Sequence, residues 1–224
     1  MKKILISIIV LFFLLTINVF AIHKCFLKPT SKGKLNFYPD FELTQGLTES
    51  VNLYTEFGLL DNLEIHLDVP QILYVDSSET DAINTSPVIG ILTSLSRHLS
   101  LIVDYTLPIV APRGFQIDTG IVYYVNLAQH LDFFAQANVP IEYINDQFGI
   151  AIYGIPGLEF NKKNFLTQIY LSMGEELAPN TQFQMTSNLH MALGLGWGKP
   201  YAEFNFDIEP ANFWRFVLGI EFTI

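Results

Sequence analysis

The chain has 224 residues, half of them hydrophobic and 15% charged, and its formal net charge is −10. This length predicts one folded domain, and the single cysteine, Cys25, has no second cysteine with which to form an internal disulfide. The 22 acidic residues outnumber the 12 basic ones, and the basic residues form no stripe that could follow a nucleic-acid backbone. We therefore expect no nucleic-acid partner.

The N-terminal region differs in composition from the rest of the chain. Two lysines at positions 2 and 3 precede an apolar run over residues 4–20, and small residues near position 21 suit cleavage. This pattern predicts a signal peptide over residues 1–21. The alternative is an uncleaved membrane anchor, because the run is just long enough to span a bilayer. Residues 22–34 form a lead-in that carries Lys24, Lys28, Lys32 and Lys34, and the barrel domain is predicted over residues 35–224.

Beyond the lead-in, hydrophobic residues alternate with polar ones and form no continuous apolar run of about 20 residues, so spanning helices are not expected. In the clearest segment, Phe183 and Met185 alternate with Gln184 and Thr186. Twelve strands are predicted on this basis, at residues 35–45, 50–59, 63–75, 83–95, 99–110, 115–126, 130–143, 148–160, 164–175, 182–196, 200–208 and 213–224. Most are longer than strands of soluble sheets and suit tilted strands that cross a bilayer.

The predicted links alternate in length. The links at 60–62, 96–98, 128–129, 161–163 and 198–199 are short, and those at 76–82, 111–114, 144–147, 176–181 and 209–212 are mostly longer. An even number of strands with short turns at one end is typical of bacterial outer-membrane barrels, whose termini lie in the periplasm. The sequence therefore predicts an all-β fold, a transmembrane antiparallel up-and-down β-barrel of about 12 strands. Its expected partners are outer-membrane lipid and the barrel-insertion machinery, although the last residue is Ile224, where such barrels commonly end in an aromatic.

Aromatic residues lie mostly toward the ends of the predicted strands. Rings at these positions would sit at the two membrane interfaces, although aromatic residues also favour strands for packing reasons alone. The residues are Tyr54, Tyr74, Tyr105, Tyr123, Tyr143, Tyr153, Tyr170, Trp197, Tyr201 and Trp214.

If the apolar face of each strand meets lipid, the opposite face lines a lumen. The candidate lumen-lining residues are Glu56, Glu64, His66, Asp68, Asp104, Asp118, Asp132, Asn188, His190, Glu203, Asp207, Arg215 and Glu221. Rings of carboxylates in a pore favour cations, so the predicted function is a passive channel or transporter for small cationic or neutral solutes. The alternative is a filled barrel in which these groups satisfy one another. Register is least constrained near residues 83–95, 148–160 and 200–208, and neither the solute, the openness of the lumen nor the oligomeric state follows from the sequence.

Enzyme signatures are missing from the sequence: it contains no GxSxG, HExxH, Walker or GxGxxG motif, and its five histidines have no ligand spacing. We therefore expect neither an enzyme nor a cofactor or metal. An outer-membrane lipid hydrolase remains as an alternative because neighbouring strands carry Ser172, Thr186, Ser187 and His190. Parity, however, puts Ser187 and His190 on opposite faces. A structural or surface-interaction barrel without transport is the other alternative.

The segment over residues 54–70, YTEFGLLDNLEIHLDVP, carries a short hairpin motif. The motif consists of Phe57, Gly58, Leu59, Leu60, Asp61, Asn62, Leu63 and Glu64. This motif resembles the hairpin of outer-membrane transporters of the phenol-degradation meta-pathway type, with a departure at Leu60, where a polar residue is usual. The resemblance implies an outer-membrane protein with a role in solute uptake, and it transfers no binding residues.

Overall fold

The computed structural model describes residues 28–44, 49–74, 87–107, 114–144, 147–178, 182–209 and 214–224. The predicted signal peptide, together with the lead-in as far as residue 27, lies outside the described residues. Within the described ranges, no helix is long and apolar enough to cross a membrane.

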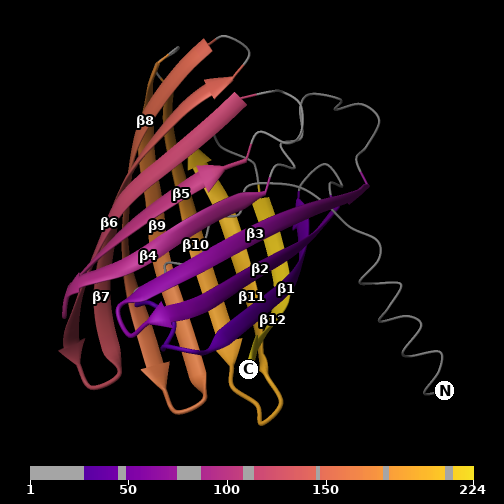
Figure 1. Ribbon diagram of the computed structural model, residues 1–224, viewed down its shortest axis with the longest axis vertical. Helices are drawn as coiled ribbons and strands as arrows, with labels where there is room; N and C mark the ends of the chain where they lie inside the picture. The colour runs from indigo at the N-terminus through magenta and orange to yellow at the C-terminus, as the bar shows by residue number, and fades with distance from the viewer. Residues whose placement is uncertain are drawn as a thin grey trace.

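The described part of the chain is built from β-strands joined by turns (Figure 1). The strands are β1 (Leu35–Thr44), β2 (Glu49–Leu60), β3 (Leu63–Tyr74), β4 (Val88–Ser96), β5 (Leu99–Thr106), β6 (Gly114–Ala128), β7 (Leu131–Ile144), β8 (Gln147–Lys162), β9 (Phe165–Ala178), β10 (Gln182–Leu193), β11 (Lys199–Glu209) and β12 (Trp214–Thr223).

Each strand pairs antiparallel with its neighbours in sequence, and β1 also pairs with β12, which closes the sheet into a barrel. At this seam Phe41 lies opposite Leu218, and Leu35 and Ile224 exchange two backbone hydrogen bonds of 3.0 and 2.9 Å. Closure leaves no edge strand whose backbone groups would need another partner. The prediction of an all-β antiparallel barrel of about 12 strands is confirmed.

Most strand boundaries agree with the alternation in the sequence to within three residues. The predicted strand at 182–196 is too long, because β10 ends at Leu193. There the Gly194 N–H donates to the Asn164 carbonyl, and a bridge between Leu195 and Gly198 begins the next turn. The predicted residues 83–86 and 108–110 lie outside the described residues.

The short turns gather at one end of the barrel, the lower end in Figure 1, together with the C-terminus. Two of them contain a non-glycine residue with positive φ, His130 at 73° and Lys163 at 55°. This left-handed conformation lets two residues reverse the chain between twisted antiparallel strands. The links at the other end lie largely outside the described residues.

The two faces of the wall differ in character. Ile121 and Ile169 on the outer face are half exposed, whereas Ser100, Ile102 and Asp104 of β5 are buried. Side chains of a strand alternate between the faces, so burial in a closed barrel marks the interior. Tyr54, Tyr170 and Tyr201 are all buried, so for these three the prediction of interface positions is wrong. Their rings pack against interior partners, because side-chain parity places them on the inner face whatever their position along the strand.

Glycines let side chains from alternate strands meet inside the barrel. Gly157 of β8 lies opposite both Phe134 of β7 and Tyr170 of β9, whose rings pack with centroids 6.1 Å apart. With Tyr124 and Ile155 these two residues form an interior apolar cluster. A Cβ on Gly157 would meet the Phe134 ring and lie 2.6 Å from the Tyr170 Cβ.

We expect Gly157→Ala to destabilise the folded barrel by about 1–3 kcal/mol, because the methyl group overpacks this cluster. Gly154→Ala on the same strand is the matched control, since a Cβ there meets nothing within 4 Å. Equilibrium urea denaturation of both variants in phospholipid vesicles measures the difference. Equal stability of the two variants would show that the cluster relaxes around the added methyl group.

Candidate functional site

The interior of the barrel is the candidate site because it concentrates buried ionisable groups. In the described part of the chain, seven Asp or Glu residues and one arginine are buried. The carboxylates are Glu42, Glu56, Glu64, Asp68, Asp104, Glu159 and Glu203, and the arginine is Arg215. His66 and His190 are buried with them. The excess of carboxylates gives the described interior a net negative charge.

The predicted lumen-lining residues fall into two groups. Nine are buried: Glu56, Glu64, His66, Asp68, Asp104, Asn188, His190, Glu203 and Arg215. The other four, Asp118, Asp132, Asp207 and Glu221, are partly exposed. Each of these four accepts a hydrogen bond: Asp118 from Asn138 (3.1 Å), Asp132 from Asn126 (2.9 Å), Asp207 from Thr186 (2.8 Å) and Glu221 from Lys199 (2.7 Å). Asp132 and Glu221 lie close to the short-turn end: Asp132 is the second residue of β7, and Glu221 is the third residue from the end of β12.

One buried cluster joins β3 to β5 across β4. His66 Nε2 lies 2.6 Å from Asp104 Oδ1, and His66 Nδ1 lies 3.5 Å from Glu64 Oε1. Gly90 of β4 lies opposite both His66 and Asp104 in the sheet, and a Cβ there would collide with both side chains. The absence of a side chain at Gly90 therefore lets the imidazole bridge two carboxylates from different strands.

A second cluster surrounds Arg215 of β12. Its Nη1 lies 3.4 Å from both carboxylate oxygens of Glu42, and its Nη2 lies 3.6 Å from Glu203 Oε1. Glu203 also accepts hydrogen bonds from Asn205 (3.1 Å) and Tyr170 (3.5 Å). All these groups are shielded from water, so the guanidinium compensates two carboxylates that would be costly to bury alone.

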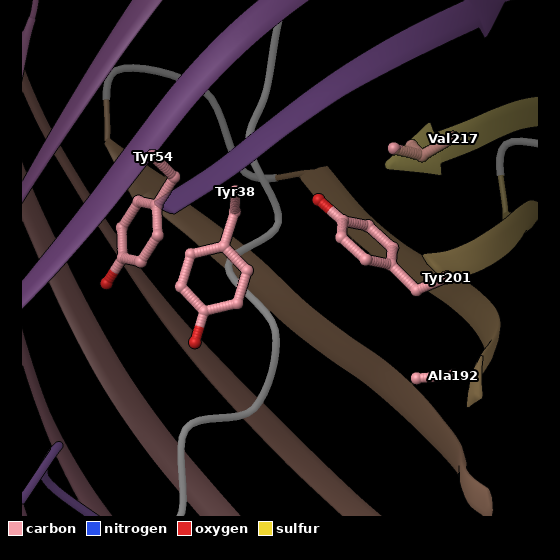
Figure 2. Packing of buried hydrophobic residues seen from close by; sticks show 5 residues of the cluster. All are labelled: Tyr38, Tyr54, Ala192, Tyr201 and Val217. Atoms are coloured by element: carbon pink, nitrogen blue, oxygen red, sulfur yellow. The ribbon is translucent and has the colours of Figure 1, made fainter. Parts of the chain in front are cut away.

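Tyrosines connect these polar groups to a buried cluster of Tyr38, Tyr54, Ala192, Tyr201 and Val217. Figure 2 shows the Tyr38 and Tyr54 rings side by side with Tyr201 facing them. The Tyr201 hydroxyl donates to Asp40 (3.0 Å) by passing over Gly219, and the Tyr38 hydroxyl donates to Glu56 (2.8 Å). The rings narrow the interior while their hydroxyls hold the carboxylates in place.

The prediction from sequence missed the interior residues of β1. Asn36, Tyr38 and Glu42 are buried, and Asp40 accepts the hydrogen bond from Tyr201. The signal was available, because these four alternate with the apolar residues between Leu35 and Leu43. The segment at 35–45 was predicted as a strand, but its inward face was not assigned.

The buried histidines pair with carboxylates in these clusters. Over the described residues, no group of three or more His, Cys, Asp or Glu side chains could hold a metal ion. Both buried histidines are engaged by carboxylates, His66 by Asp104 and His190 by Glu203 at 3.4 Å. The buried carboxylates of these clusters can therefore stabilise positive charge and accept hydrogen bonds.

A comparison with models of known protein families found no match, and neither did a comparison with curated proteins. Solved structures do match. The KdgM porin in complex with disordered oligogalacturonate is similar with a TM-score of 0.60 and 11% identity, over 84% of this chain and 98% of that one. The NanC porin is similar with a TM-score of 0.66 and 6% identity, over 83% and 98%. At these identities the similarity establishes a shared fold, the closed barrel of porins.

Proposed function

We propose that the protein is a passive channel of the bacterial outer membrane for small cationic or neutral solutes. The observation that carries the proposal is the charge of the interior, in which seven buried carboxylates face a single buried arginine over the described residues. Carboxylates along a narrow aqueous path lower the energy of a cation and raise that of an anion. The porin fold supports the same function class.

The outer face supports placement in a membrane. Large hydrophobic side chains such as Leu53, Ile121 and Phe204 are exposed on β2, β6 and β11, strands from several sides of the barrel. Lipid would cover them, as the apolar band of outer-membrane barrels requires. In this placement the signal peptide exports the chain, the insertion machinery assembles it, and the short turns face the periplasm.

The solute differs from that of one structural neighbour. Oligogalacturonate, found with the KdgM porin, is a chain of sugar acids and carries many negative charges. The net negative charge of the described interior would repel such a polyanion. We therefore assign cationic or neutral solutes to this chain, despite the shared fold.

The narrower assignment to transporters of the phenol-degradation meta-pathway type rests on the hairpin motif alone. It implies the same function class, uptake of a small solute. No family model matches, so we propose a solute channel and assign it to no pathway. Interior pairs such as Arg215 with Glu42 also suit a structural barrel, which would carry no current.

Reversal potentials in planar bilayers should show that the protein conducts cations better than anions. Asp118→Asn together with Asp207→Asn should lower the cation-to-anion permeability ratio, because both carboxylates are interior and partly exposed. A charge about 4 Å from a passing ion contributes about 1 kcal/mol in water, with opposite sign for a cation and an anion, so each lost carboxylate should lower the ratio by up to about thirtyfold. Asp61→Asn, in the exposed β2–β3 turn, is the matched control and should leave the ratio unchanged.

Three results would count against parts of this proposal. A folded barrel that carries no current in any lipid would refute it, and hydrolysis of the vesicle lipids would favour the enzyme. Block of the current by added oligogalacturonate would contradict the assignment of cationic or neutral solutes. Heat-modifiable migration on a gel verifies that each variant is folded.

A further inference from the structure

The last residues of the lead-in lie against the inner surface of the barrel at the short-turn end. The Gly33 N–H donates to the Gly58 carbonyl (2.7 Å), and the Gly58 N–H donates to the Lys34 carbonyl (3.0 Å). A further bond from Lys34 N–H to the Ser31 carbonyl (3.0 Å) closes a turn in which Gly33 has a φ of 75°. A Cβ on Gly58 would collide with the backbone of Ser31, so the glycine lets the segment lie directly on β2.

Thr30 carries the segment into the interior, where its side chain is only 8% exposed. Its N–H donates to Glu64 Oε2 (2.6 Å), and its hydroxyl donates to Glu56 Oε2 (2.8 Å). The Asn36 amide donates to the same hydroxyl at 3.1 Å. Two buried carboxylates of the proposed lumen are therefore bound by the chain itself, through hydrogen bonds that their charge strengthens.

Lys28 extends the segment across the mouth of the barrel. Its Nζ lies 4.9 Å from the centre of the Tyr124 ring, on β6, whereas Thr30 is bound on β2 and β3. The segment therefore contacts strands that are separated in the ring by β4 and β5. An ammonium group over an aromatic face is attracted by the ring, and the surrounding acidic interior complements the lysine-rich lead-in.

We propose that the N-terminal segment around Lys28–Lys34 is a built-in plug, which docks on Glu56, Glu64 and Tyr124 and narrows the short-turn mouth. The proposal rests on the proposed channel function and adds its regulation. Undocking of the segment would free the two carboxylates and widen the path. The occupant of this surface is a part of the same chain, so its local concentration is high and fixed by the short connection to β1.

Thr30→Val in the full chain tests the plug because valine keeps the volume and removes the hydroxyl bond to Glu56. Loss of a hydrogen bond to a charged group should raise the undocked fraction about tenfold or more. Two readouts follow the change: the single-channel conductance, and the rate of trypsin cleavage in the folded barrel after Lys28, Lys32 or Lys34. Both should increase. Adding Lys28→Ala removes the contact with Tyr124 and should increase the conductance further. Trypsin cleavage at the two remaining sites, Lys32 and Lys34, should also increase further.

Thr55→Val is the matched control. Thr55 is exposed on the outer face of β2, where its hydroxyl donates to the Leu67 carbonyl at 3.3 Å. It should change neither conductance nor cleavage. Unchanged cleavage in Thr30→Val would refute the docking, and faster cleavage with an unchanged current would refute the plug alone. Faster cleavage without any current from any variant would refute the channel, and the plug with it.

Discussion

Arg215→Met should lower the free energy of unfolding by about 3–5 kcal/mol, the cost of removing one partner from a buried ion pair. Arg215 contacts Glu42 and Glu203, and all three side chains are at most 7% exposed. Methionine retains much of the volume but leaves two carboxylates buried without their cation. Urea denaturation in phospholipid vesicles, followed by tryptophan fluorescence, measures the loss.

Lys199→Met is the control for this prediction. Lys199 pairs with Glu221 at 2.7 Å, but its side chain is 53% exposed. Pairs of this kind contribute about 0–1 kcal/mol, so the control should remain close to the unmodified protein. Adding Glu42→Gln and Glu203→Gln to Arg215→Met should restore part of the stability, because neither of the two side chains that lose the guanidinium is then charged. Equal losses for Arg215→Met and Lys199→Met would mean that water reaches the Arg215 cluster.

Ile121→Arg should destabilise the barrel by about 2–4 kcal/mol if the outer face lies in a membrane. Ile121 occupies the middle of β6 and is 50% exposed, so the guanidinium would lie at the centre of the apolar band. The penalty comes from the hydrocarbon around the site, because the outward position leaves room for the longer side chain. Denaturation in vesicles measures this effect.

Leu127→Arg is the control on the same strand. Leu127 is 56% exposed and lies next to the β6–β7 turn, where the membrane interface is expected. An arginine there costs about 0–1 kcal/mol in barrels of this kind. If both variants lose the same stability, Ile121 does not lie at the centre of the membrane. If neither loses any, the outer face does not meet lipid.

The fold could be predicted from the sequence because the relevant signals are local. A strand needs only alternation, as between Phe183 and Gln184 in β10, and a hairpin needs only a short polar link between two such segments. Parity then assigned Glu64, His66 and Asn188 to the inward face, and each of these side chains is buried. Those three steps require no knowledge of which strands lie side by side.

The contacts of the interior could not be predicted, because they depend on register across several strands. His66 meets Asp104 only because Gly90 stands between them, and this requires the register of β4 to be correct to one residue. Periodicity left the register near residues 83–95 undetermined. The structure settles it with Gly90 and Leu92 inside and Ile89 and Ile91 outside. Hydrogen bonds such as that from Thr30 to Glu64 arise outside any strand pattern.

The seam between β1 and β12 has a consequence for biogenesis. Pairing of Leu35 with Ile224 closes the longest loop in the barrel sequence, and the entropy lost in joining two points of a chain increases with the length between them. Until then, each intermediate carries two open edges that would accept a strand from another copy. A cell that produces this chain therefore has to shield it from its own copies until the last pairing is complete.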